Sequence, residues 1–147
     1  IYIEGLAAHG SRPEEGINAI FPLQYALKEL EIINHELDQE DPHPYLGKAT
    51  LHPGIISGGT AQSVIAAQST LNWERRTLPK ESQQKLNEEL NRVIEAVRNA
   101  PGNHKVSGKQ VYHRPPNEVE DDSLIQNCKS LLVENPLTAC LTGPIQH

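Results

Sequence analysis

Apolar and polar positions in the first third of the chain follow the period of an amphipathic helix. Over residues 20–40, apolar side chains recur every three or four positions, with charged side chains between them. Pro22 must lie in or near the first turn, where a missing N–H is tolerated, and Asn18 is a plausible cap. The apolar stripe consists of Ile20, Leu23, Leu27 and Leu30, with Ile17 and Phe21 beside it.

A second helix has the clearest pattern in the chain. Its apolar positions recur every three or four residues, and its exposed positions carry Glu88, Glu89, Arg92 and Glu95. Pro101 and Gly102 mark its end. The apolar stripe consists of Leu86, Leu90, Val93, Ile94 and Val97.

Four extended segments surround these helices. Residues 1–9, 50–57, 63–76 and 104–113 read as strands because they are apolar or alternate between apolar and polar. Gly58-Gly59 predicts a tight reversal between the second and third strands, since glycine adopts positive φ without strain.

The element order is therefore strand, helix, strand, strand, helix, strand. This order predicts an α+β fold of the ferredoxin-like βαββαβ type, with two helices on one face of a four-stranded antiparallel sheet. We expect the domain to span residues 1–116. Residues 114–117 read as a linker, and residues 117–147 form a separate remainder that includes a short helix at 124–133.

Composition excludes several classes of protein. The 147 residues carry a net charge of −6, with acidic residues scattered, which speaks against a nucleic-acid partner. No run of apolar residues is long enough to span a membrane. The two cysteines, Cys128 and Cys140, lack the Cys-x-x-Cys spacing and favour reduced thiols in a cytoplasmic protein. Because the chain has no methionine and opens inside an apparent strand, we expect a piece of a larger protein.

His9 is the first candidate for a catalytic or binding residue. His9 stands where the first strand ends, before a Gly-Ser-Arg-Pro turn, and loops at strand ends often carry function. A solvated or capping histidine is the simpler interpretation. None of the seven histidines has the His-x-His or His-x-x-x-His spacing that places two imidazoles together, so we expect no metal site in this chain.

Two patterns resemble the lid, or dimerisation, domain inserted in the zinc-dependent amidohydrolase and exopeptidase family. That family includes acetylornithine deacetylase, succinyl-diaminopimelate desuccinylase, aminoacylase and carboxypeptidase G. The first pattern is matched by Gly5, His9, Pro13, Gly16, Asn18 and Ala19, and the second by Gly58, Gly59, Thr60, Val64, Ile65, Arg76 and Pro79. Three positions depart from the second pattern: Ser63 stands where Asn is usual, Ala66 where Pro is usual and Gln68 where Glu is common.

The resemblance implies a role for three residues. His9 would be the imidazole that reaches from one subunit of a homodimer to the partner's active site and donates to the developing oxyanion. Arg76 would pair with a substrate carboxylate, and Ser63 would donate one hydrogen bond to the substrate. An outward salt-bridging arginine and a structural turn serine are the alternatives. Zinc, or cobalt, and the general base would lie in the catalytic domain, to which residues 117–147 would begin the return.

The resemblance thus implies the dimerisation and lid domain of an enzyme that cleaves N-acyl amino acids or small peptides, inactive by itself. Two other functions remain open. Ferredoxin-like domains also serve as small-molecule-binding regulatory modules, because fold does not fix function. An assembly domain in which His9 has no catalytic role is the second alternative.

Overall fold

The computed structural model describes residues 1–111 together with 123, 126, 128 and 130. The chain divides into two units, Ile1–Pro116 and Asn117–His147, and the first is described by itself below. The linker expected at 114–117, most of the short helix expected at 124–133, and Cys140 fall outside the described residues.

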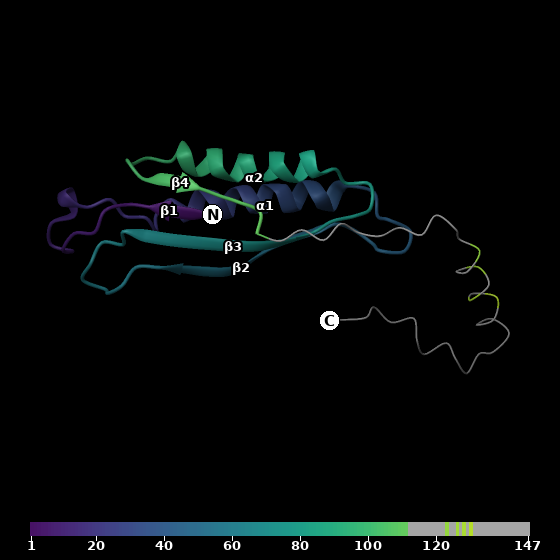
Figure 1. The fold of residues 1–147 in the computed structure, drawn as a ribbon, viewed down its shortest axis with the longest axis horizontal. Helices are drawn as coiled ribbons and strands as arrows, with labels where there is room; N and C mark the ends of the chain where they lie inside the picture. The colour runs from purple at the N-terminus through teal and green to yellow at the C-terminus, as the bar shows by residue number, and fades with distance from the viewer. Residues whose placement is uncertain (112–122, 124–125, 127, 129, 131–147) are drawn as a thin grey trace. The chain divides into compact units, whose positions relative to one another are not determined.

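The first unit contains a four-stranded antiparallel sheet with two helices against one face (Figure 1). The strand order in the sheet is β2-β3-β1-β4, and each neighbouring pair is antiparallel. This arrangement confirms the predicted α+β fold. The elements in chain order are β1 (Tyr2–Glu4), η1 (Pro13–Glu15), α1 (Leu23–Gln39), β2 (Thr50–Gly58), β3 (Gln68–Arg76), α2 (Gln83–Arg98) and β4 (Lys105–Ser107).

The core lies between the sheet and the two helices. The buried side chains of α1 are spaced three or four residues apart, which puts them on one face of the helix. They pack with Val93 and Val97 of α2 and with Ile3 and Leu71 of the sheet. Each fully buried aliphatic side chain contributes about 1.5–3 kcal/mol, so this layer supplies most of the driving force. The buried residues of α1 are Leu23, Ala26, Leu30, Ile33 and Leu37.

The start of α1 differs from the expectation. Pro22 occupies the N-cap position, which agrees with its predicted place near the first turn, but the predicted cap Asn18 is wrong. The Asn18 Oδ1 accepts a hydrogen bond from Ile20 N at 2.8 Å, four residues before the cap. The Asn18 side chain therefore stabilises the turn that leads into the helix. In α2 the Ser82 side chain is the cap and accepts from Lys85 N.

The expected tight reversal after β2 is also wrong, because residues 59–67 form a longer connection and β3 begins only at Gln68. Gly59 has a φ of +73°, so its positive φ was correctly expected. The start of the predicted third strand, residues 63–65, pairs instead with the segment after β1: Ile65 N donates to Ala8 O at 2.9 Å, and His9 forms an isolated bridge with Val64. Its backbone groups are satisfied there rather than by β2.

Two other predicted strands are shorter in the structure. β1 is regular only over Tyr2–Glu4, and the chain after it continues through isolated bridges, Leu6 with Ile17 and His9 with Val64. β4 covers Lys105–Ser107, and the described residues that follow it carry no strand. The alternating sequence pattern therefore covers more residues than the part that forms regular strand pairs.

Candidate functional site

His9 sits in a turn that is held from both sides. Arg12 N donates to His9 O at 2.8 Å and closes the turn, while Gly10 N donates to Ser63 O at 2.7 Å. A Cβ on Gly10 would lie 3.0 Å from that same oxygen, so the close approach of the two segments favours glycine. The backbone beneath the imidazole is thereby fixed in place, although the side chain itself is exposed.

The imidazole has one occupied and one open nitrogen. The Nδ1 of His9 lies 2.7 Å from Ser11 Oγ and accepts from Ser11 N at 3.2 Å. Among the described residues no hydrogen-bond partner is found for Nε2. The geometry thus offers an exposed nitrogen on an anchored turn, which is what a donor to an external ligand requires.

Ser63 belongs to the same part of the molecule. Its backbone oxygen is the acceptor for Gly10 N, so it lies directly beside the turn that carries His9. The residue is exposed, and its hydroxyl has no hydrogen-bond partner among the described residues. The structure therefore brings together two of the three residues singled out in the sequence.

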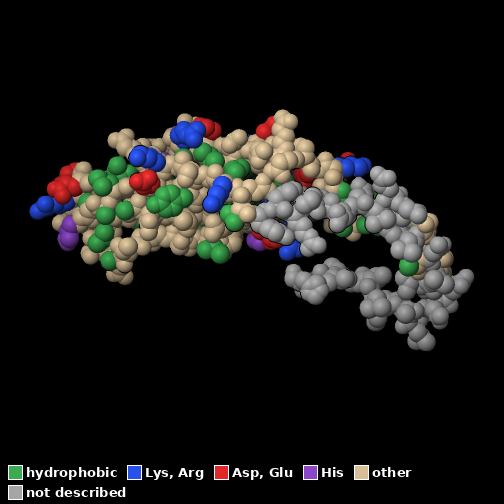
Figure 2. All heavy atoms as spheres, viewed as in Figure 1, with side chains coloured by type: hydrophobic (Ala, Val, Ile, Leu, Met, Phe, Trp, Pro, Cys, Tyr) green, Lys and Arg blue, Asp and Glu red, His purple; other side chains and the backbone are tan. Residues whose placement is uncertain are grey.

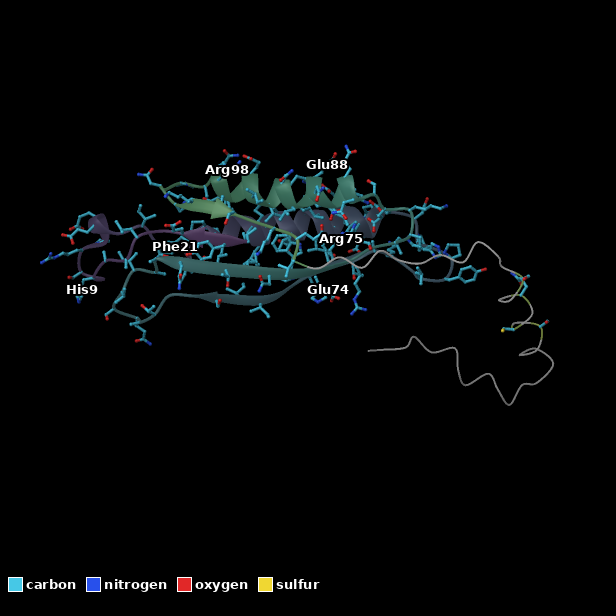
Figure 3. The ribbon with its side chains drawn as sticks, viewed as in Figure 1. His9, Phe21, Glu74, Arg75, Glu88 and Arg98 are labelled. Carbon is cyan, nitrogen blue, oxygen red and sulfur yellow. The ribbon has the colours of Figure 1, made fainter. Side chains whose placement is uncertain are left out.

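Arg76 lies away from the other two. It ends β3, whereas Ser63 precedes the start of that strand. The nine residues of β3 put its two ends about 26 Å apart. Its Nε is 3.4 Å from Glu74 Oε1, and its side chain is 63% exposed. Figure 3 accordingly shows His9 at one end of the ribbon and Glu74 and Arg75 toward the other. No small substrate can contact His9 and Arg76 of one chain at once.

The neighbour of Arg76 has the opposite environment. Arg75 points to the helix side of the sheet, where its Nε donates to Glu89 Oε2 at 2.9 Å and its guanidinium also contacts Glu81 (Figure 3). The side chains of Arg75, Glu81 and Glu89 are only 9%, 7% and 11% exposed. Lys85 extends the network to Glu40 at 2.6 Å. This cluster joins β3, α2 and the end of α1, and the sequence analysis missed it.

Within the buried cluster, the pKa of Glu81 and the pKa of Arg75 are both shifted in the direction that favours the charged form. Burial alone would raise the pKa of Glu81, but hydrogen bonds from Arg75, Leu78 N and Lys85 outweigh it, and the net pKa is lowered. Burial alone would lower the pKa of Arg75, but hydrogen bonds to Glu89 and Glu81 outweigh it, and the net pKa is raised. Both groups therefore stay charged at neutral pH, and the cluster has the features of a structural clamp.

A groove of about 670 Å³ runs along the second half of β3, beside α2. Trp73 and Arg76 line it from the sheet, Leu86 and Leu90 line it from α2, and Ile1 also belongs to the lining. His9 and Ser63 do not belong to its lining. The groove is therefore separate from the exposed imidazole.

The described residues do not fit a metal centre. They contain no group of three or more His, Cys, Asp or Glu side chains placed to hold an ion. His104 Nε2 contacts Val97 O at 2.8 Å, and His52 lies 3.4 Å from Glu74. Nor does any described helix combine the length and the apolar character needed to cross a membrane.

Comparison with known proteins places this geometry in a family. The profile of the peptidase dimerisation domain matches residues 1–100. The acetylornithine deacetylase of Edwardsiella ictaluri is 32% identical over 99 residues, covering 66% of this chain and 26% of that protein. The corresponding enzyme of Pasteurella multocida is 38% identical over 93 residues, covering 60% and 24%. The chain thus spans about a quarter of the length of the curated relatives it matches.

Solved structures agree on the fold. The aminopeptidase PepT from Bacillus cereus superposes with a TM-score of 0.56 at 19% identity, covering 90% of this chain and 33% of that one. At this identity the likeness concerns the fold alone. Together with the profile over 100 of the 147 residues, it leads to one conclusion: the chain belongs to the peptidase dimerisation domain family.

Proposed function

We propose that this chain is the homodimerisation and lid domain of a cytoplasmic, metal-dependent amidohydrolase or exopeptidase that cleaves N-acyl amino acids or small peptides. Residues 1–116 are the lid, and residues 117–147 begin the return to a catalytic domain that holds zinc or cobalt. The observation that carries the proposal is the open Nε2 of His9 on a turn anchored by Ser63. Such a donor suits an oxyanion that develops on a substrate carbonyl.

The partner in this proposal is a second copy of the chain, joined through β2. β2 has nine residues and forms one edge of the sheet, whereas the other edge, β4, has only three. A long open edge is a template for pairing with another strand. Ile55 and Ile56 on this strand are 61% and 53% exposed, and Phe21, before α1, is 70% exposed. These apolar side chains favour a protein partner.

Antiparallel pairing of two β2 strands would build a composite site. Arg76 pairs with Thr50 at one end of β2, and the connection that carries Ser63 follows the other end. A two-fold axis reverses the second strand, so the Arg76 end of one sheet meets the His9 end of the other. A site would then combine Arg76 of its own chain with the partner's His9 and the partner's Ser63. This arrangement resolves the separation of Arg76 from His9 within one chain.

Nucleic acid and membranes have no place in this proposal. The net charge is −6, and charges of both signs are scattered over the visible described surface, without a basic stripe (Figure 2). Electrostatic attraction to phosphates needs such a stripe. A small acylated amino acid or peptide remains the proposed substrate.

Mixing two impaired variants of the full-length enzyme tests the composite site. His9→Ala should lower kcat, and Arg76→Ala should raise KM for a carboxylate substrate by about tenfold or more. A heterodimer of the two variants has one site with its own Arg76 and the partner's His9 both intact. Activity should therefore recover in the heterodimer, in which at most one of the two sites is intact.

Two outcomes would contradict parts of the proposal. Single variants with normal kcat and KM would remove both residues from catalysis and leave an assembly domain, for which the open β2 edge suffices. Impaired single variants that never complement would keep the lid function but assign His9 and Arg76 to the same side of the dimer.

A further inference from the structure

Ser11 contacts Nδ1 of His9, the ring nitrogen other than the open Nε2. Its hydroxyl oxygen lies 2.7 Å from His9 Nδ1, and its backbone N–H donates to the same nitrogen at 3.2 Å. A backbone N–H can only donate, so Nδ1 must present its lone pair to it. The neutral imidazole therefore carries its proton on Nε2.

The turn keeps this arrangement local and compact. Arg12 N bonds to His9 O at 2.8 Å, which places Ser11 inside the turn that begins at His9. The Ser11 hydroxyl can donate to the neutral ring or accept from Nδ1–H of the charged ring, whereas the backbone N–H opposes a proton on Nδ1. Both contacts orient the ring, and only the neutral form with Nε2–H satisfies both.

We propose that Ser11 is a positioning residue that fixes the tautomer and orientation of His9, so that Nε2–H is the group presented to substrate. The inference rests on the proposed function for the use of that proton, but not for the tautomer itself. Fixing the other ring nitrogen by a hydrogen bond is a general way to set which imidazole nitrogen is protonated. An imidazole without this contact would divide its proton between the two nitrogens.

The tautomer is measured on the 147-residue chain by ¹⁵N NMR of the histidine rings at pH 8. This pH is above the ordinary histidine pKa of about 6.5. His9→Gln assigns the His9 signals. We expect one acceptor-type nitrogen, Nδ1, and one protonated nitrogen, Nε2. Ser11→Ala removes the hydroxyl contact and leaves only the backbone N–H to hold Nδ1, so the two shifts should move partly toward each other, while Ser11→Thr should keep the original pattern.

A matched control is Ser107→Ala, which removes an exposed hydroxyl on β4. It should leave the His9 signals unchanged. Unchanged ring shifts in Ser11→Ala, or averaged shifts already in the unmodified chain, would overturn the assignment of the tautomer to Ser11.

Activity of the full-length enzyme separates this inference from the proposed function. Ser11→Ala should lower kcat by about 2- to 10-fold, the effect of one hydrogen bond, with little change in KM and with recovery in Ser11→Thr. If His9→Ala lowers kcat but Ser11→Ala does not, the positioning role is wrong and the lid function stands. If His9→Ala leaves kcat unchanged, the catalytic role of His9 fails, and a shift in the NMR signals of Ser11→Ala then reports only a local contact.

Discussion

At the scale of single residues, neighbouring positions in this chain have opposite roles. Arg75 and Arg76 are adjacent in β3, and because strand side chains alternate between faces, one is buried against α2 and the other is exposed. Arg75 forms ion pairs with the carboxylates of Glu81 and Glu89. The exposed Arg76 is the candidate for binding a substrate carboxylate. A similar division holds between Ser11, which contacts the His9 ring, and Ser63, which contacts the turn by its backbone.

Loss of the His9 imidazole tests the residue with the proposed catalytic role. In the full-length enzyme, His9→Ala should lower kcat by about 10²–10³, roughly 3–4 kcal/mol, because one oxyanion donor is lost. KM should change little, since the interaction belongs to the transition state. Steady-state kinetics measures both. Unfolding of the variant by urea is the control and should match the parent, because the side chain is exposed.

The two arginines give a matched pair for stability. Arg75→Met should lower the free energy of unfolding by about 3–5 kcal/mol, since it leaves Glu89 buried without its partner and leaves Glu81 with only Lys85 and Leu78 N. Arg76→Met should cost less than about 0.5 kcal/mol, because its ion pair is exposed. Urea unfolding at pH 7 compares them. Equal losses would mean that the cluster around Arg75 is solvated in solution.

The same cluster predicts how stability depends on pH. The pKa of Glu81 lies below its ordinary value of 4.5 in the folded chain. Its contribution is therefore fully present above that value and is lost as the pH falls through the folded pKa. Urea unfolding between pH 7 and pH 3 should show this decline. The decline should be smaller in Glu81→Gln, and Glu88→Gln, which changes an exposed residue of α2, should behave like the parent.

At the scale of elements, the two edges of the sheet are unequal. β2 offers nine residues and β4 three, so only β2 provides a long pairing surface. α1 packs beside β2, and Ile20 lies close to Gly59 at the end of that strand. The strand edge and the start of α1 thus form one continuous region. Dimerisation would bury the exposed apolar side chains of this region.

A charge placed on each edge tests this asymmetry. Ile56→Lys introduces a cation on the exposed β2 strand and should shift the chain from dimer to monomer at micromolar concentration. Ser107→Lys places the same charge on β4 and should leave the dimer intact. Light scattering with size-exclusion chromatography reads the mass. A well-folded parent chain that is only monomeric would argue against dimerisation by this domain alone.

At the scale of the whole molecule, folding and chemistry are separable. The core is formed by aliphatic side chains of two helices and three strands, β1, β2 and β3, and no buried side-chain nitrogen or oxygen among the described residues lacks a hydrogen-bond partner. No metal ligand set takes part in that core. The domain therefore has the means to fold by burial of apolar surface.

The isolated chain should accordingly fold without metal and hydrolyse nothing. After dialysis, zinc measured by elemental analysis should be far below one per chain, and unfolding by urea should be insensitive to a chelator. The reason is that metal-dependent folding requires ligands that the described residues do not bring together. Tightly bound zinc at one per chain would contradict the prediction that the histidines of this chain form no metal site.

The sequence by itself determined the two helices, the order of the elements and the family. Helix periodicity is local, and Leu23 and Leu30 of the first predicted stripe and Val93 and Val97 of the second are buried. Ile20 of the first stripe is the exception, because it lies before the helix and is 44% exposed. Fold class followed because the order of elements leaves few ways to cover the sheet. His9 and Ser63 were identified as candidate site residues from two motifs, one with the sequence of a turn and one with the sequence of a glycine-rich connection.

Only the tertiary structure decided which residues meet. Alternation extended the predicted third strand to Ser63, yet residues 63–65 pair with the segment around His9 because that segment offers free backbone groups. The partners of Arg75 lie 6 and 14 residues away in the chain, and the distance of Arg76 from His9 follows from the length of β3. Side-chain periodicity shows which face of an element is apolar, whereas pairing across the sheet depends on hydrogen-bond partners distant in sequence, which no local pattern encodes.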